Sequence, residues 1–234
     1  MKVEIWSDVM CPFCYIGKRK IDQAMAIFPY KEQVSIEWKS YQLNPNLVTD
    51  TTTSSTEFLA RHKGVPLEQA EEMNQYVTEM AAQVGLTFNL ADAVVANSFQ
   101  AHSFLHFAKA AGKQHEAEEL VFKAYFTEGK NIDDVEELMS IARSLDLDAD
   151  ALQKALAANS YADAVRDDVL ESQQIGVRGV PFFVFDRKYA ISGAQDLQVF
   201  EDTLFKSHSE WTATIMPTLK TIDGGESCGP EGCT

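Results

Sequence analysis

The sequence predicts an α/β protein in which a βαβ unit and a ββα unit are separated by a large all-helical segment. Short apolar runs of strand type occur near both ends of the chain, whereas the apolar residues between them recur every three or four positions. The chain has 234 residues, of which 45% are hydrophobic, so it can bury a sizeable core as one large domain or two small ones.

The first unit is expected to cover residues 1–50. Apolar and polar residues alternate in its two strand candidates, and Pro12 suits the first turn of a helix that Pro29 then stops. Residues 44–56 are rich in Asn, Pro and Thr and are expected to form a loop. The predicted elements are a strand at Lys2–Asp8, a helix at Pro12–Phe28 and a strand at Val34–Leu43.

Residues 51–175 are expected to form the helical insertion. Apolar residues at helical spacing stop before glycines, which readily take the left-handed conformation that ends a helix. The last predicted stretch is long enough for one or two helices. The predicted helices contain Leu67–Val84, Ala101–Ala108, Leu120–Ala124, Val135–Ala142 and Leu152–Gln174, with glycines at 85, 112, 129 and 176.

Residues 176–216 return to the strand pattern. Phe182–Phe185 is a continuous apolar run, as expected of a strand buried on both faces, and a short turn joins it to a second strand at Tyr189–Ser192. Ala194–Ser207 has helical spacing and is expected to close this ββα unit. Residues 217–234 form a Gly- and Glu-rich tail.

The charge of the chain restricts its partners. Twenty basic and 35 acidic side chains give a net charge of −15, which repels nucleic-acid backbones. The first ten residues lack an apolar run of signal-peptide length, and no stretch approaches the roughly 18 apolar residues that a membrane span needs. We therefore expect a cytoplasmic protein with no nucleic-acid and no membrane partner; the oligomeric state does not follow from the sequence.

The first two of the four cysteines form the motif Cys11-Pro12-Phe13-Cys14 at the predicted change from strand to helix. This spacing brings two sulfurs within disulfide reach, and the positive end of the helix dipole favours the thiolate of Cys11. Cys14 lies one turn inside the helix, where it can resolve a mixed disulfide. The motif predicts a dithiol–disulfide exchange centre that Pro12 and Phe13 tune; the alternative is half of a zinc knuckle.

The segments WSDVMCPFCYIGK and GVRGVPFFVF together resemble the DsbA-like thioredoxin-fold family, specifically its FrnE-type branch, and the resemblance covers residues 1–210. It implies a thioredoxin fold with a large all-helical insertion and a thiol:disulfide oxidoreductase/isomerase that acts on protein or small-molecule disulfides and dithiols. No cofactor or metal is expected, and glutathione is a candidate redox partner.

The resemblance also implies that the Val180–Pro181 bond is cis and faces the cysteine pair, with the backbone of Val180 holding the substrate chain. The alternative is an ordinary trans proline at the start of a strand.

Three further positions are candidates. Asp8 can shuttle protons or tune the thiols, or it is a turn aspartate without a chemical role. His102 and His106 have the spacing of two metal ligands on one helix face but lack a third ligand, and the resemblance places His102 beside the substrate cleft. The acidic run Glu116–Glu119 is expected on a solvated helix face.

The second cysteine pair, Cys228 and Cys233, closes the sequence CGPEGC near the C-terminus. Its Gly and Pro residues allow a tight turn. Similar pairs in FrnE-type proteins imply an accessory redox couple that exchanges electrons with Cys11 and Cys14. A pair without a role and a four-thiolate metal site shared with the first pair are the alternatives.

Two other function classes are compatible with the sequence. Kappa-type glutathione transferases and chromene-carboxylate isomerases share the architecture implied by the resemblance, but have a serine near the first cysteine position and no resolving partner. The presence of both Cys11 and Cys14 distinguishes the present chain from that pattern. The third candidate is a client-binding module that the second cysteine pair switches by oxidation.

Overall fold

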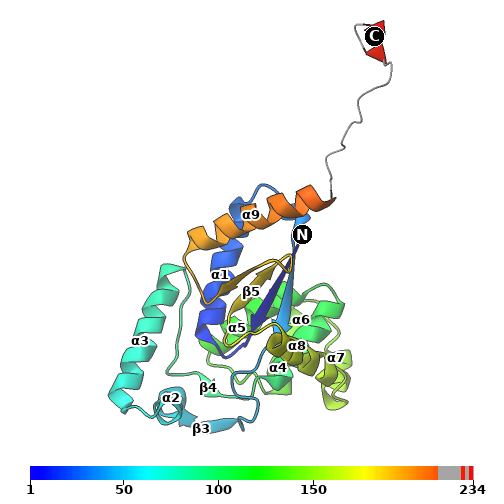
Figure 1. The fold of residues 1–234 in the computed structure, drawn as a ribbon. Helices are drawn as coiled ribbons and strands as arrows, with labels where there is room; N and C mark the ends of the chain where they lie inside the picture. The colour runs from blue at the N-terminus through cyan, green and yellow to red at the C-terminus, as the bar shows by residue number, and fades with distance from the viewer. Residues whose placement is uncertain (216–227, 230–231, 234) are drawn as a thin grey trace.

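The computed structural model describes residues 1–215, together with the backbone of residues 228–229 and 232–233. A four-stranded sheet in the order β2-β1-β5-β6 lies at its centre (Figure 1). Strand β1 is parallel to β2 and antiparallel to β5, so the two ends of the described chain form one sheet, as predicted. Its strands are β1 (Lys2–Ser7), β2 (Ser35–Ser40), β5 (Phe182–Phe185) and β6 (Tyr189–Ser192).

Helices α1 (Pro12–Ile27) and α9 (Leu197–Ile215) pack against each other and against one face of the sheet. Side chains alternate along a strand, so Val3 and Ile5 of β1 both point into this layer and are fully buried. A 3₁₀ turn at Lys31–Gln33 leads from α1 to β2.

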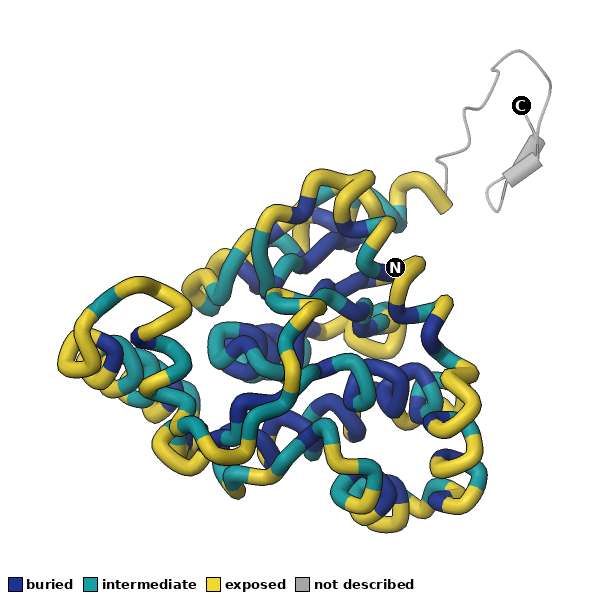
Figure 2. The backbone as a smooth tube through the Cα atoms, turned by 90° about the horizontal axis from the view of Figure 1, so that it is seen from below, coloured by how far each residue is buried: buried dark blue, intermediate teal, exposed yellow. Residues whose placement is uncertain are grey.

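The helical segment covers the opposite face. Trp6 of β1 is fully buried on this side, and its indole N–H donates to the backbone carbonyl of Asp168, 2.9 Å away. Figure 2 shows that the buried stretches gather at the centre and the exposed ones at the rim. The helices of this layer are α4 (Phe99–Ala110), α5 (Gln114–Phe126), α6 (Val135–Ser144), α7 (Ala149–Ala157) and α8 (Ala162–Gln174).

A small unit at one side of the molecule corrects the loop prediction. Residues Asp50–Ser54 form strand β3, which pairs with β4 (Val94–Val95), so the expectation of a loop over residues 44–56 was wrong there. Three consecutive threonines favour a strand, but their partner lies about 40 residues later and leaves no local signal.

Helix α2 (Ser55–Lys63) begins inside the same predicted loop, and α3 (Leu67–Gln83) follows it. The hydroxyl of Ser54 accepts the backbone N–H of Glu57, and the Glu57 carboxylate accepts that of Ser54, which fixes the start of α2.

The helix ends agree well with the predictions. Gly85, Gly112, Gly129 and Gly176 all adopt positive φ angles. The last predicted helical stretch is interrupted near Asn159, which has a φ of 51°, so it forms α7 and α8. Within residues 1–215, none of the helices combines the length and the apolar composition that a membrane span requires.

The second cysteine pair lies in two short strands, β7 (Cys228–Gly229) and β8 (Gly232–Cys233). These strands pair antiparallel with Cys228 opposite Cys233. The side chains of both cysteines are outside the described residues, so the accessory redox role stays a prediction.

Candidate active site

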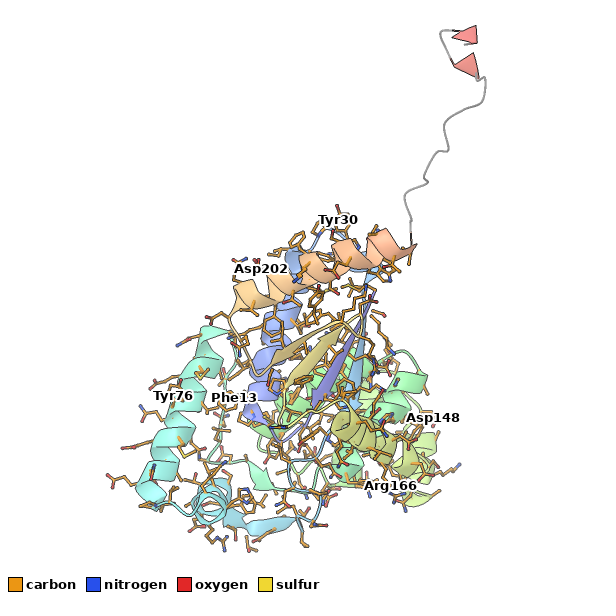
Figure 3. All side chains as sticks on the ribbon, in the orientation of Figure 1. Phe13, Tyr30, Tyr76, Asp148, Arg166 and Asp202 are labelled. Atoms are coloured by element: carbon orange, nitrogen blue, oxygen red, sulfur yellow. The ribbon has the colours of Figure 1, made fainter. Side chains whose placement is uncertain are left out.

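The first cysteine pair lies where β1 passes into α1, as predicted. The N–H of Cys11 donates to the carbonyl of Asp8 over 2.9 Å and closes the turn between strand and helix. Cys11 is the N-cap residue with extended backbone angles (φ −90°, ψ 112°), and Pro12 occupies the first helical turn. Phe13 lies at this same end of α1 (Figure 3). The Cys11 side chain is therefore at the positive end of the α1 dipole.

The two thiols differ in burial. Cys11 is 5% exposed and Cys14 is not exposed at all. Burial raises the pKa of Cys14 well above its ordinary value, and the hydrogen bond and charge of Cys11 raise it further. The Ser7 hydroxyl and the Asp8 backbone N–H act in the opposite direction but do not compensate. Cys14 therefore holds its proton more tightly than an ordinary thiol, and of the two sulfur-bearing side chains only that of Cys11 has any exposed surface.

The proline segment faces the pair. The Val180–Pro181 bond is cis, as the family resemblance implies. The Cys11 sulfur lies 3.6 Å from the carbonyl oxygen of Val180, so the segment just before β5 that carries Pro181 borders this sulfur directly. Binding of a substrate chain by Val180 and Pro181 stays a prediction.

Gly17 is a site residue that the sequence analysis missed. A Cβ at this position would lie 3.0 Å from Cγ of Pro181 and 3.0 Å from Cζ of Phe183. Glycine thus lets α1 approach the proline segment closely. The available signal was a glycine inside a helix, where it costs about 1 kcal/mol relative to alanine and so indicates a packing requirement.

Asp8 and His102 are brought together beside the pair. Asp8 is 1% exposed, and its carboxylate accepts the backbone N–H groups of Met10 at 3.3 Å and Leu43 at 2.7 Å. Nε2 of His102 lies 3.4 Å from Oδ1 of Asp8, and the ring is 2% exposed. Asp8 therefore holds the loop between β1 and α1. The predicted contact of His102 with substrate, and the tuning roles of Asp8, Pro12 and Phe13, stay predictions.

His106 belongs to a different group of side chains. Its Nε2 lies 3.1 Å from Oδ2 of Asp168 and 3.2 Å from the hydroxyl of Ser40. The two histidines of α4 thus have separate partners. Within residues 1–215 no group of three or more His, Cys, Asp or Glu side chains is placed to hold a metal ion.

The expectation of a solvated face was wrong for Glu118, which is 1% exposed. The Ser7 hydroxyl donates to its Oε1 over 3.1 Å. Burial raises the pKa of Glu118 to about 7. Ser7 and Glu118 are 111 residues apart, so no local pattern predicts their contact.

Comparisons with known proteins agree with this fold. Residues 2–205 match the model of the DSBA-like thioredoxin domain. The crystal structure of a probable DsbA oxidoreductase from Streptomyces coelicolor is 36% identical, with 100% of this chain and 98% of that chain covered and a TM-score of 0.85. These similarities confirm the predicted thioredoxin fold with its helical insertion; the FrnE-type branch stays a prediction.

Two more distant structures share the fold. The cytosolic disulfide reductase DsbM from Pseudomonas aeruginosa, solved with GSH, is 15% identical with a TM-score of 0.62, and the match covers 92% of this chain and 99% of that chain. A 2-hydroxychromene-2-carboxylate isomerase is 16% identical with a TM-score of 0.62, and the match covers 92% of this chain and 96% of that one.

Proposed function

Because the chain belongs to the DSBA-like thioredoxin domain family, we propose that it is a thiol:disulfide oxidoreductase/isomerase acting on protein disulfides, with Cys11 as the nucleophile and Cys14 as the resolving thiol. The observation that carries the proposal is the contrast between the two sulfurs. Cys11 is at the α1 N-terminus beside Val180, whereas Cys14 is fully buried behind it with a raised pKa.

The proposed reaction transfers two electrons in two steps. The Cys11 thiolate attacks one sulfur of a substrate disulfide, which forms a mixed disulfide and releases the other substrate sulfur as a thiolate. Cys14 then loses its proton and attacks the Cys11 sulfur. The second substrate thiolate leaves, and the Cys11–Cys14 disulfide has formed. Substrate oxidation is the same sequence reversed.

The first test is insulin reduction together with refolding of a scrambled disulfide protein. Cys11→Ser should abolish both activities, because the remaining thiol at the site, Cys14, is fully buried and does not reach the substrate. Cys14→Ser should stop turnover after the first step. Far-UV circular dichroism checks that both variants remain folded. Full activity of the Cys11→Ser variant is the result that excludes the proposal.

Glutathione is the reductant that we propose for regenerating the dithiol. Two glutathione molecules reduce the Cys11–Cys14 disulfide and leave as glutathione disulfide. The similar DsbM structure contains GSH and comes from a cytosolic disulfide reductase, which supports this partner and a cytoplasmic location for the present chain. Turnover with glutathione as the sole reductant tests this partner; turnover only with a dithiol reductant excludes it.

We also propose that Cys228 and Cys233 exchange electrons with the first pair. Their backbones are opposite each other in β7 and β8, a register that is compatible with a small disulfide-closed loop. A Cys14→Ser variant should then form a trapped disulfide between Cys11 and the tail, which peptide mapping detects. Absence of that species under oxidising conditions contradicts an electron exchange between the two pairs.

A further inference from the structure

A buried path of polar atoms leads from Cys14 into the helical layer. The Ser7 hydroxyl donates to Oε1 of Glu118, 3.1 Å away, and it is near enough to Cys14 to lower the pKa of that thiol. All three residues are at most 1% exposed. The path joins α1, β1 and α5. Of its three residues, the proposed function uses only Cys14.

Glu118 has capacity left to bind a proton. Its second oxygen, Oε2, has no hydrogen-bond partner among the described residues, and Nε2 of His102 is also without one. Burying a carboxylate oxygen without a hydrogen bond costs free energy while the group is charged. This free-energy cost falls when the group takes up a proton.

Several charged or titratable groups face Glu118 from the surrounding elements. Lys18 of α1 is already paired with Asp22 at 2.8 Å and Glu119 at 3.1 Å. Burial has the largest effect on the pKa of Glu118 and raises it to about 7, although four neighbours act to lower it. These are His102 of α4, Ser7 of β1, Lys18 of α1 and His115 of α5.

The resolving step needs a proton acceptor at this place. Cys14 attacks only as a thiolate, yet its burial favours the protonated thiol. Because Cys14 is completely buried, bulk water does not collect the proton directly. The Ser7 hydroxyl influences the pKa of the Cys14 thiol and already directs its own proton toward Glu118.

We propose that Glu118 receives the proton of Cys14 through the hydroxyl of Ser7. This inference rests on the proposed function. The thiol proton of Cys14 moves to Oγ of Ser7 as the hydroxyl proton moves to Oε1 of Glu118. The Cys14 thiolate attacks the Cys11 sulfur, a new S–S bond forms, and the substrate sulfur leaves with the electron pair of the broken bond. In the opposite direction Glu118 returns the proton to Cys14.

The two steps can be followed separately with 5,5′-dithiobis(2-nitrobenzoate) in single-turnover experiments. The full-length chain carries serine at positions 228 and 233, so that only the first pair reacts. Attack by Cys11 releases one coloured thiolate and resolution by Cys14 releases the second. In Glu118→Gln the rate of the first phase should stay within about twofold of the rate with Glu118 present. The rate of the second phase should fall by roughly 10²-fold, which is the usual contribution of a positioned base.

The pH profile separates proton transfer from a structural effect. In the wild type the second phase should accelerate as the pH rises through about 7, because only ionised Glu118 accepts the proton. In Glu118→Gln this inflection should disappear, and the rate should rise only where Cys14 itself ionises. Glu119→Gln is the matched control on the same helix, because Glu119 pairs with Arg19 and should keep the inflection.

Ser7 provides an independent pair of variants. Ser7→Ala should slow the second phase as Glu118→Gln does, and Ser7→Thr, which keeps the hydroxyl, should restore it. The two Ser7 variants test the proton transfer through Ser7 even if Glu118→Gln does not fold. A second phase with unchanged rate and inflection in Glu118→Gln, or in Ser7→Ala, overturns the relay while two-step turnover by the wild type still supports the proposed function. Absence of a Cys11-dependent first phase in the wild type instead overturns the proposed function.

Discussion

Gly17 of α1 packs directly against Pro181, and a Cβ at position 17 would lie 3.0 Å from Cγ of that proline. We expect Gly17→Ala to push the proline segment away from the cysteine pair, which lowers the free energy of unfolding by about 1–3 kcal/mol, as overpacking does. It should also reduce insulin reduction. Chemical denaturation and the turnover assay measure the two effects.

The control for this prediction is Gly179→Ala, because a Cβ at position 179 meets no atom within 4 Å. Its free energy of unfolding should stay close to that of the wild type. Equal stability of the two variants would show that the contact between Gly17 and Pro181 does not constrain the site.

Asp8 should contribute to stability through the loop that carries the cysteine pair. Asp8→Ala removes the acceptor of the part-buried Leu43 N–H bond, which measures 2.7 Å. A hydrogen bond to a charged group contributes about 1.5–3 kcal/mol, and partial access of water to the freed N–H places the expected loss at the lower end of this range. Thermal and urea unfolding measure the loss, and Asp8→Asn, which keeps one oxygen, should recover part of it. A fully stable Asp8→Ala variant would contradict the structural role.

Asp168 connects α8 to β2. Its carboxylate accepts from the Ser40 backbone N–H at 2.9 Å and from Lys39 at 3.0 Å. Asp168→Ala should destabilise the protein by about 2–4 kcal/mol, because it leaves buried donors without a partner. On the same helix, Asp163 forms an exposed ion pair with Arg166, so Asp163→Ala should cost less than about 0.5 kcal/mol. Equal losses of free energy of unfolding in the two variants, measured by urea denaturation, would contradict this ranking.

The contribution of Asp168 should depend on pH in a defined direction. Burial raises the pKa of this carboxyl, but hydrogen bonds from His106, the Ser40 N–H and Lys39 outweigh burial and lower it below its ordinary 3.8. The stabilisation is therefore complete above the unfolded pKa and is lost as the pH falls through the lower folded pKa. The difference in free energy of unfolding between wild type and Asp168→Asn should stay constant near neutral pH and shrink below pH 3.8. If the difference in free energy of unfolding between the two proteins grows on acidification, the predicted pH dependence is contradicted.

Much of the fold and part of the site followed from local patterns in the sequence. The strand and helix around Cys11 were predictable because a proline at the first helical turn and alternating apolar residues act locally. Strand β3 was missed because its partner β4 is a two-residue strand far along the chain. Glu118 was missed for a similar reason, since only the fold brings Ser7 of β1 to this carboxylate.

The most direct test of the central claim is to trap the mixed disulfide. Cys14→Ser, with serine also at positions 228 and 233, is incubated with a disulfide-bonded peptide and mapped by mass spectrometry. We predict a stable adduct on Cys11, and no accumulating adduct when Cys14 is present. Absence of an adduct on Cys11, or equally rapid adduct formation on Cys14 in a Cys11→Ser variant, would contradict the assignment of Cys11 as nucleophile and Cys14 as resolving thiol.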